Sequence, residues 1–352
     1  MNTEYYDGTK LLSLKDINGK APEIYLCTTN RTGGKTTYFN RLCVNNFIKK
    51  KEKFCLLYRW SYELDSIAEK FFKDIQELFF QEREMKSEVR AKGMYHELYL
   101  GKKNDVDSFV PCGYAVALNN ADAVKKNSHL FSDVKRILFD EFQSETNHYC
   151  SKEIDKFLSI HKSMARGQGK QWRYVPVYMI SNPVTILNPY YVSMGITDRL
   201  RDDTRFLKGD GYVMEQGFNE SAMKAQLESG VSRAFKSTDY VAYASQGVYL
   251  NDKKAFLENV EGRSKYLCTI RCDGKDFAIR EYTDRGIIYC DSRVDGTFKM
   301  KLCITTEDHD VNYVMLKRNE LFVSTLRFFF DHGSFRFKNL ECKQAILKML
   351  SY

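Results

Sequence analysis

Residues 27–38 read CTTNRTGGKTTY and decide how the first half of the chain is interpreted. A phosphate-binding loop follows the Walker A pattern G-x-x-x-x-G-K-[ST]. The stretch supplies Gly34, Lys35 and Thr36 but has Thr29 in place of the first glycine. The apolar run EIYLC precedes it, and apolar residues recur at helical spacing after it. Strand, glycine-containing loop and helix is the order in which phosphate loops occur, so we predict a phosphate loop with one substituted position.

The loop and the first helical turn after it carry the groups that bind a triphosphate. Backbone amides and a helix N-terminus form a cradle of partial positive charge. Glycine has no Cβ, so the phosphates can approach this part of the backbone closely. Lys35 is expected to reach the β- and γ-phosphates and Thr36 to hold Mg²⁺, while Arg31 can add a second cation. The predicted nucleotide-binding residues are Thr29, Asn30, Arg31, Thr32, Gly33, Gly34, Lys35, Thr36 and Thr37.

Two adjacent carboxylates end a second apolar run, in the stretch RILFDEF at residues 136–142. Because the carboxyl ends of parallel strands meet at one edge of a sheet, Asp140 and Glu141 are expected beside the loop. There Asp140 can order Mg²⁺ and Glu141 can polarise the attacking water. An isolated Asp-Glu pair is an ordinary solvated strand end, and an isolated imperfect loop is an ordinary helix cap. Together and in this order, the two motifs favour nucleotide hydrolysis.

Two further polar features follow along the chain. Asn182 comes after a strand predicted at 175–180, where NTPases with an additional strand place a residue that senses the γ-phosphate. Asn-Pro is also a common turn starter. The basic loop MARGQGK carries Arg166, which can complete the site of a neighbouring subunit as an arginine finger. The alternative interpretations of this loop are a solvated segment or a contact to DNA phosphates.

Apolar runs that alternate with helical patterns predict a mostly parallel, doubly wound α/β sheet in the first half of the chain. At 352 residues the chain is too long for one ordinary core. We expect a P-loop ATPase domain at residues 1–208, a linker subdomain with a helix over 220–235 at residues 209–262, and a C-terminal domain at 263–352. In the last domain, Asp-Gly turns predict an antiparallel meander with a fourth strand at 298–304, followed by two helices.

The composition limits which binding partners and which cellular compartment are expected for this protein. The net charge of +8 is a moderate bias toward polyanions and does not by itself identify a nucleic-acid-binding protein. The ten cysteines form no C-x-x-C pair, and the N-terminus MNTEYYDGTK has no secretory pattern, which favours a reducing compartment. No stretch approaches the roughly 18 apolar residues of a membrane span. We expect a soluble protein in the cytoplasm, with no membrane partner.

The motifs in combination resemble the short DNA-packaging motor ATPases of Salasviridae-type podophages. In chain order they are TTNRTGGKTT, FCLLYRW, RILFDEF, MARGQGK, MISNPVTILNPYY, SKYLCTIRCDGKDFAIREY and DRGIIYCD. The resemblance covers nearly the whole chain, and it implies an additional-strand (ASCE) P-loop ATPase domain, a small linker and an RNase H-like α+β domain without nuclease activity. It further implies a homopentameric ring that uses ATP and Mg²⁺ to drive double-stranded DNA through the portal into a preformed procapsid. In some relatives a structural packaging RNA lies between the ring and the portal.

The resemblance also implies roles for individual residues. It assigns the loop arginine to Arg31 and the sensor to Asn182. It assigns the metal-binding and catalytic acids to Asp140 and Glu141, and the trans-acting arginine to Arg166.

The sequence departs from the family pattern at two positions. The first glycine of the loop is Thr29, and the trans-acting lysine falls on Asn127. Lys125 and Lys126 lie beside that asparagine, so the sequence leaves open which of them acts, if either does.

The acidic residues of the C-terminal domain lie in predicted turns. A two-metal nuclease needs several carboxylates that converge on one site. Asp273, Asp284 and Asp295 each fall where a tight turn favours Asp for backbone reasons, and Cys268 and Cys272 alternate onto one strand face as core residues do. We therefore predict a nuclease-like scaffold without a metal site.

Three functions remain open at this stage. The leading one is an ATP-driven motor that translocates viral DNA. The second is a terminase large subunit with a working nuclease, which metal-dependent plasmid cleavage would reveal. The third is a non-hydrolysing nucleic-acid adaptor whose phosphate loop has decayed, which would release no phosphate from ATP.

Overall fold

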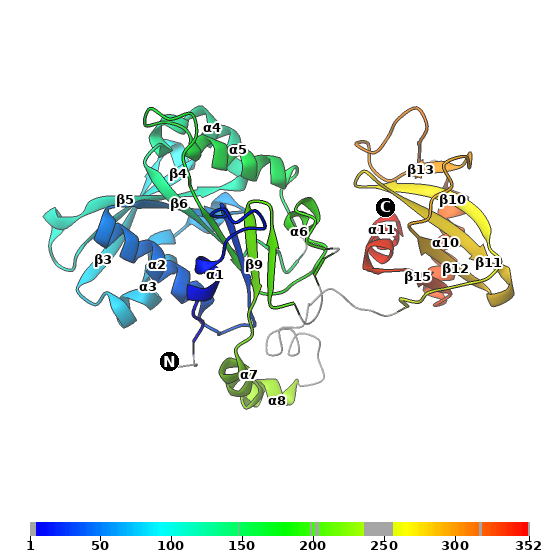
Figure 1. Ribbon diagram of the computed structural model, residues 1–352, viewed down its shortest axis with the longest axis horizontal. Coiled ribbons are helices and arrows are strands. Elements are labelled where there is room, and N and C mark those ends of the chain that lie inside the picture. Colours follow the sequence, from blue (N-terminus) through cyan, green and yellow to red (C-terminus); the bar gives the residue numbers. More distant parts are fainter. Residues whose placement is uncertain are drawn as a thin grey trace. The chain divides into compact units, whose positions relative to one another are not determined.

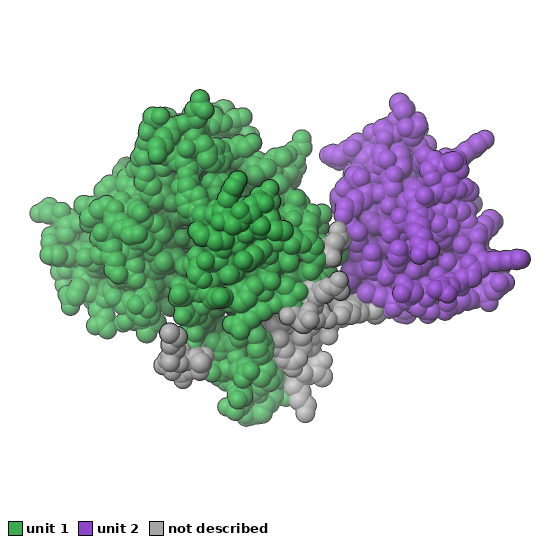
Figure 2. All heavy atoms as spheres, in the orientation of Figure 1, with its two compact units in different colours: residues 1–251 green, residues 252–352 purple. Residues whose placement is uncertain are grey.

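The computed structural model describes residues 5–146, 148–197, 199–200, 204–235, 256–316 and 319–350. The chain divides into two compact units, residues 1–251 and 252–352 (Figure 2). The part of the predicted linker at residues 236–255 lies outside the described residues. The predicted three-domain division therefore stays a prediction.

The first unit is built on a nine-stranded sheet of order β3-β4-β5-β2-β6-β7-β1-β9-β8 (Figure 1). Neighbours from β5 to β9 in this order pair in parallel, whereas the β3–β4, β4–β5 and β8–β9 pairs are antiparallel. This confirms the mostly parallel α/β sheet. The strands are β1 (Ile24–Thr28), β2 (Lys53–Tyr58), β3 (Arg83–Arg90), β4 (Tyr95–Lys102), β5 (Val110–Ala117), β6 (Val134–Asp140), β7 (Val177–Ser181), β8 (Phe206–Gly209) and β9 (Tyr212–Gln216).

Helices cover both faces of this sheet because successive strand residues point to opposite sides. In β2, Leu56 packs in the core with the helix residues Phe39 and Phe71. Leu57 packs in the opposite core with Val124 and Phe157. The α-helices among the described residues of the first unit are α1 (Thr9–Ser13), α2 (Lys35–Lys50), α3 (Ile67–Phe79), α4 (Ala121–Lys126), α5 (Glu153–Ala165), α6 (Pro189–Ser193), α7 (Glu220–Leu227) and α8 (Gly230–Ala234).

Two details of the first unit differ from expectation. Strand β9 belongs to the main sheet although it follows residue 208, because it pairs with β1 in parallel over its full length. The single helix expected over 220–235 is two helices. Ser229 begins the second of them, since its side chain accepts a hydrogen bond from the Ser232 amide.

Over its described residues, the second unit is a six-stranded mixed sheet of order β14-β13-β10-β11-β12-β15 with two α-helices, which agrees with the α+β expectation. The hairpins β10–β11 and β11–β12 are antiparallel. The prediction that the fourth strand continues this meander is wrong, because β13 pairs with β10 in parallel. The chain therefore crosses the sheet after β12 and does not fold back as a hairpin. The elements are β10 (Lys265–Cys272), β11 (Lys275–Tyr282), β12 (Ile287–Asp291), β13 (Lys301–Cys303), β14 (Val314–Met315), β15 (Phe335–Phe337), α10 (Glu320–Asp331) and α11 (Leu340–Leu350).

Acidic side chains stabilise turns and loops of the second unit by accepting hydrogen bonds. Asp308 accepts hydrogen bonds from the amides of Asp273, at 2.9 Å, and Gly274, at 2.7 Å, which form the β10–β11 turn. Asp276 accepts from Arg271 and from the Tyr313 hydroxyl, the latter at 2.7 Å. Within the described residues, no three His, Cys, Asp or Glu side chains gather to hold a metal ion. All ten cysteines are buried and free, and no described helix is long and apolar enough to cross a membrane.

Candidate nucleotide-binding site

The predicted loop, the twin acids and the sensor asparagine meet at the carboxyl edge of the main sheet. Strand β7 lies between β1 and β6, with Thr28 opposite Ser181 and Asp140 opposite Ile180. The strand of the phosphate loop and the strand of the acids are therefore separated by one additional strand, as expected. A cavity of about 220 Å³ lies at their ends. It is lined by Arg31, Thr32, Lys35, Thr36, Asp140, Glu141, Ser181 and Asn182.

The loop has the backbone shape that a phosphate cradle requires. Lys35 is the first residue of α2, and Gly34 precedes it in the left-handed region with φ 88°. Any residue with a Cβ is strained in that region. Thr32 is also left-handed, with φ 59°. At Gly33 a Cβ would lie 3.3 Å from the Cβ of Asn219, so the position leaves little room for a side chain.

The missing first glycine is compensated from another strand. Thr29 is 2% exposed, and its hydroxyl donates to the Asn30 carbonyl at 3.1 Å. A Cβ built on Gly217 would lie only 2.8 Å from the Thr29 Cγ2 methyl group. The glycine that makes space for this loop therefore follows β9 and does not stand in the loop itself.

Asn30 faces away from the cavity and fixes the loop to the chain that follows β9. Its side chain donates to the Asn219 carbonyl at 3.0 Å and accepts from the Asn219 amide at 2.9 Å. Gln226 of α7 donates to the Arg31 carbonyl at 2.7 Å and to the Thr32 hydroxyl at 2.6 Å. Arg31 itself pairs with Glu145. Helix α7, which the sequence placed in the linker, thus supports the phosphate loop.

Lys35 and Asn182 are joined directly. The lysine is 8% exposed, and its Nζ donates to the Asn182 Oδ1 at 2.7 Å. Burial lowers the pKa of Lys35, and the charge of Asp140 opposes that shift. Burial outweighs the charge of Asp140, so a further negative charge from an anionic ligand would stabilise this ammonium.

Asp140 has too little positive charge around it. Burial raises the pKa of this carboxyl group to about 6, since the opposing charge of Lys35 is offset by Glu141. Its Oδ1 accepts from the Glu141 amide at 2.9 Å, and the Thr36 side chain also bonds to it. A carboxylate with a raised pKa beside a second carboxylate is an electrostatic environment that a bound cation would stabilise.

Two other residues of the cavity are unusual: one has a buried hydroxyl group without a hydrogen-bond partner among the described residues, and the other has a strained backbone. The Ser181 hydroxyl is buried and has no hydrogen-bond partner within the described part of the chain. Glu141 has φ 55°, a left-handed conformation that residues with a Cβ adopt mostly where function requires it. The sequence pointed to Glu141 by its position but gave no sign of this conformation.

Some predicted residues lie away from the cavity. Thr37 is in the first turn of α2 but does not line it. Arg166 is exposed and follows α5, which returns the chain to the amino edge of the sheet. There Arg173 donates to the carbonyls of Val134, at 3.0 Å, and Arg166, at 3.4 Å. Arg166 therefore lies at the sheet edge opposite the phosphate loop of its own chain.

The lysines that the sequence left open are on α4. Lys125 and Lys126 are both exposed in its last turn. Asn127 ends the helix, and its side chain donates to the Ala123 carbonyl at 2.9 Å. The asparagine thus has a structural partner, whereas the two lysines face solvent.

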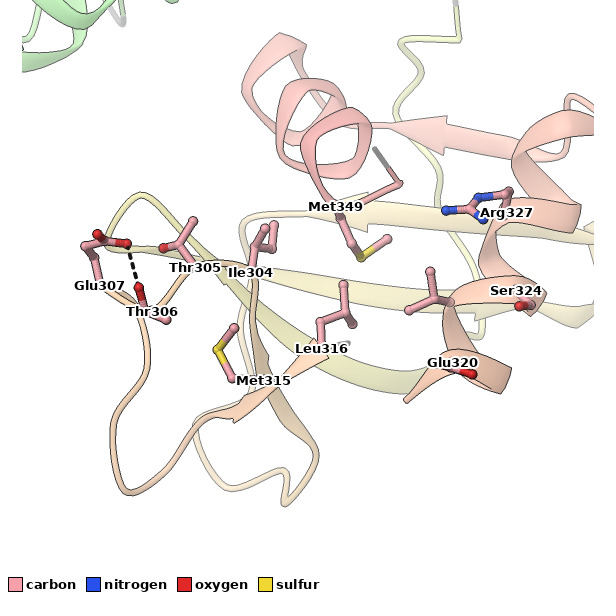
Figure 3. A pocket seen from close by; sticks show the side chains of 11 residues that line it. Ile304, Thr305, Thr306, Glu307, Met315, Leu316, Glu320, Ser324, Arg327 and Met349 are labelled. Carbon is pink, nitrogen blue, oxygen red and sulfur yellow. Dashed lines mark hydrogen bonds between the residues drawn. The ribbon is translucent and has the colours of Figure 1, made fainter. Parts of the chain in front are cut away.

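A larger cavity, of about 470 Å³, lies in the second unit but lacks the chemistry of a phosphate site (Figure 3). Aliphatic and thioether side chains such as Leu316 and Met349 form much of its lining. Among the described residues, Arg327 is the cation that lines it, while Glu307 and Glu320 are anions. In the described part of the second unit, no glycine loop and no pair of adjacent acids border this cavity, so size alone would have pointed away from the candidate site.

Comparisons with known proteins agree with this geometry. A model of the podovirus DNA encapsidation protein (Gp16) family matches residues 2–351. The DNA packaging protein of Bacillus phage phi29 is 23% identical over 311 residues, which cover 87% of this chain and 86% of that protein. The DNA packaging protein of Bacillus phage B103 is also 23% identical, over 310 residues that cover 87% of this chain and 89% of that protein.

Among solved structures, the bacteriophage Phi-29 viral genome packaging motor assembly contains a similar chain, with a TM-score of 0.65 and 22% identity. The match covers 98% of this chain and 99% of that chain. The Phi-28 gp11 DNA packaging motor is similar with a TM-score of 0.59 at 15% identity, over 100% of this chain and 99% of that chain. The fold is therefore shared across both units, and the predicted additional-strand P-loop class is confirmed.

Proposed function

This chain belongs to the podovirus DNA encapsidation protein (Gp16) family, and we propose that it packages double-stranded viral DNA by hydrolysing ATP between β1, β6 and β7. One observation carries the catalytic part of this proposal. A buried lysine on a glycine-bounded loop, two adjacent acids and an asparagine from three neighbouring strands line a single small cavity.

Binding of the triphosphate falls to the loop and its cations. The amides at the start of α2 and the Lys35 ammonium attract the phosphates. Lys35 is held by Asn182 at 2.7 Å, so a γ-phosphate would share or displace that contact. Asn182 would thereby respond to the presence of the γ-phosphate, which is the role of a sensor residue.

The donor set fits Mg²⁺, which Thr36 and Asp140 would hold. The pKa of Asp140 is raised, and the buried Ser181 hydroxyl has no hydrogen-bond partner among the described residues. Both features support a polar ligand or a cation at this place. When bound with the nucleotide, the ion would neutralise phosphate charge that develops during the reaction.

Glu141 would act on the attacking water. The water oxygen bonds to the γ-phosphorus, the bond from that phosphorus to the β–γ bridging oxygen breaks, and Glu141 accepts a proton from the water. The products are ADP and inorganic phosphate. Lys35 stabilises the negative charge that shifts to the bridging oxygen.

Completion of the site falls to a second copy of the chain. Arg166 lies at the far edge of its own sheet, so it would reach only a neighbouring subunit's phosphates. A homopentameric ring at the portal satisfies this arrangement and follows from the family resemblance; a packaging RNA is implied for some relatives only, and the sequence leaves open whether this chain needs one. DNA would be gripped through its phosphates, so translocation would be largely independent of sequence.

The test is DNA-stimulated phosphate release by the full chain. Lys35→Ala and Glu141→Gln are each expected to lower kcat by about 100-fold or more. Lys49→Ala, at the exposed far end of α2, is the matched control and should retain the parent rate. Equal rates in the parent, Lys35→Ala and Glu141→Gln would overturn the assignment of both residues and favour the non-hydrolysing adaptor. Cleavage of plasmid DNA that depends on a divalent metal would favour the terminase with a working nuclease.

A further inference from the structure

A buried ion pair lies behind Glu141 and has no part in the chemistry described above. Arg59 follows β2 and Glu153 begins α5, and their side chains are 6% and 2% exposed. Arg59 Nε lies 3.1 Å from each carboxylate oxygen of Glu153. Charges this deeply buried are retained only where the geometry satisfies them well.

The guanidinium of Arg59 also holds the backbone of the acidic turn. Its Nη2 donates to the Phe142 carbonyl at 2.7 Å, and its Nη1 donates to the Glu141 carbonyl at 3.3 Å. Glu141 is the residue with the left-handed φ of 55°. The three guanidinium nitrogens together connect Glu153 of α5 to the turn that carries the strained Glu141.

Glu153 is itself fixed from two further sides. The Tyr190 hydroxyl donates to Oε1 at 2.9 Å, and the Cys150 amide donates to Oε2 at 2.8 Å. Burial disfavours the charged form of Arg59, but the charge and hydrogen bonds of Glu153 outweigh it and raise the pKa of Arg59. The arginine stays charged, and its orientation is set by a carboxylate with donors on both oxygens.

We propose that Arg59 is a positioning residue for ATP hydrolysis, which Glu153 holds in place so that the turn aims the Glu141 carboxylate into the nucleotide cavity. This inference rests on the proposed function. Because Arg59 lies behind the turn and does not line the cavity, its loss should misplace Glu141 without weakening the phosphate-binding contacts.

A second ion pair of the same sheet provides the comparison for a purely structural role. Arg136 near the start of β6 pairs with Glu52, which precedes β2. It lies at the amino edge of the strands, while Arg59 follows the carboxyl end of β2. A pair that only stabilises the core should behave like this one when it is neutralised.

The experiment measures steady-state ATP hydrolysis by the full chain with DNA. The double variant Arg59→Gln/Glu153→Gln neutralises the pair without leaving one charge unpaired, and Arg136→Gln/Glu52→Gln is its control. We expect kcat of the first to fall about 30-fold with KM for ATP within about threefold, because displacement of a catalytic group lowers the rate more than binding. The control should keep both parameters within about threefold of the parent.

Two gentler variants cover the case in which the double variant does not fold. Arg59→Lys keeps the charge but cannot span two carbonyls and a carboxylate, so kcat should fall about tenfold. Tyr190→Phe removes one donor to Glu153 and should lower kcat about threefold. A parent-like kcat in these variants, or a rise in KM that accounts for the loss, would overturn the inference.

The proposed function and this inference fail in different ways. If Glu141→Gln hydrolyses ATP at the parent rate, the proposed function has failed. If Glu141→Gln is inactive while the Arg59 variants keep the parent kcat, only the positioning role has failed.

Discussion

The two units use buried or half-buried acids in opposite ways. Asp140 in the first unit has a pKa raised to about 6 by burial, with Lys35 opposing and Glu141 adding to the shift. Asp276 in the second unit is also affected by burial, but hydrogen bonds from Arg271 and Tyr313 outweigh it and lower its pKa. The charge of Lys35 does not outweigh the burial of the first acid, whereas hydrogen bonds outweigh the burial of the second. An acid that its own chain leaves unsatisfied indicates a ligand, whereas an acid that the chain satisfies indicates structure.

The difference extends to the backbone around the acids. Glu141 beside Asp140 is held in a left-handed conformation, and Ser181 nearby has no partner within the described residues. Asp308 in the second unit instead closes a hairpin turn through two amides. We therefore infer a ligand for the first cluster, whereas the acids of the second cluster stabilise the chain itself.

The largest effect that tests this comparison is the loss of activity in Asp140→Asn. The variant should lower kcat/KM for ATP by about 1000-fold, because a neutral amide would replace the carboxylate that we propose as a ligand of the metal ion. Its thermal midpoint should equal or exceed that of the parent at pH 8, since an unfavourably buried charge has been removed. Calorimetry and phosphate release on the same preparation check both. A large loss of stability would mean that Asp140 is structural.

Asp308→Ala should show the converse. The two turn amides lose their acceptor, which should destabilise the second unit by about 1–2 kcal/mol. DNA-independent ATP hydrolysis should stay within about twofold of the parent, because the phosphate loop and its acids belong to the other unit. Thermal unfolding and the basal rate measure the two effects. A loss of basal activity without a loss of stability would contradict the assigned structural role.

The two acids should also give opposite dependences of stability on pH. Asp140 has a raised pKa in the folded state, so its contribution to stability is largest at low pH and is lost as the pH rises from about 4 to about 6. Asp276 has a lowered pKa, so its contribution is present at neutral pH and is lost as the pH falls below about 4. Relative to the parent, Asp140→Asn should gain stability across pH 4–6, and Asp276→Asn should lose stability mainly above pH 4. If the stability of the two variants relative to the parent changed with pH in the same direction, the proposed difference between Asp140 and Asp276 would be wrong.

The smallest expected effect concerns the substituted glycine of the loop. Gly217→Ala places a Cβ 2.8 Å from the Thr29 methyl group, so the loop should shift and KM for ATP should rise about threefold to tenfold. Adding Thr29→Gly removes that methyl group and should restore KM. KM for ATP is measured for the parent, for Gly217→Ala, for Thr29→Gly and for the double variant, which together form a double-mutant cycle. An unchanged KM in Gly217→Ala would show that the contact does not shape the loop.

The parts of the candidate site whose chemistry is local could be predicted from the sequence. The loop from Gly33 to Thr36, the acids Asp140 and Glu141, and Asn182 were all found because each follows an apolar strand at a recognisable offset. The nine-stranded sheet then brings most of them to one cavity.

Features that depend on tertiary contacts were not predictable from local pattern. Strand β3 reads REMKSEVR and buries Met85 as its one fully buried side chain, so it has no apolar signature. The space for the Thr29 side chain comes from Gly217, which is far away in the sequence. Arg59 donates a hydrogen bond to the Glu141 carbonyl, but nothing in its local sequence, YRW, predicts that contact. The crossover before β13 was missed because turn chemistry predicts hairpins but not which sheet edge the next strand joins.

The most direct test of the central claim is a structure of the full chain with Mg²⁺ and ADP–beryllium fluoride. We predict that the phosphate groups occupy the cavity at the ends of β1, β6 and β7, with Lys35 and Thr36 in contact and both acids facing the ligand. A cavity left empty at saturating ligand, or a ligand bound there with Asp140 and Glu141 turned away from it, would contradict the account.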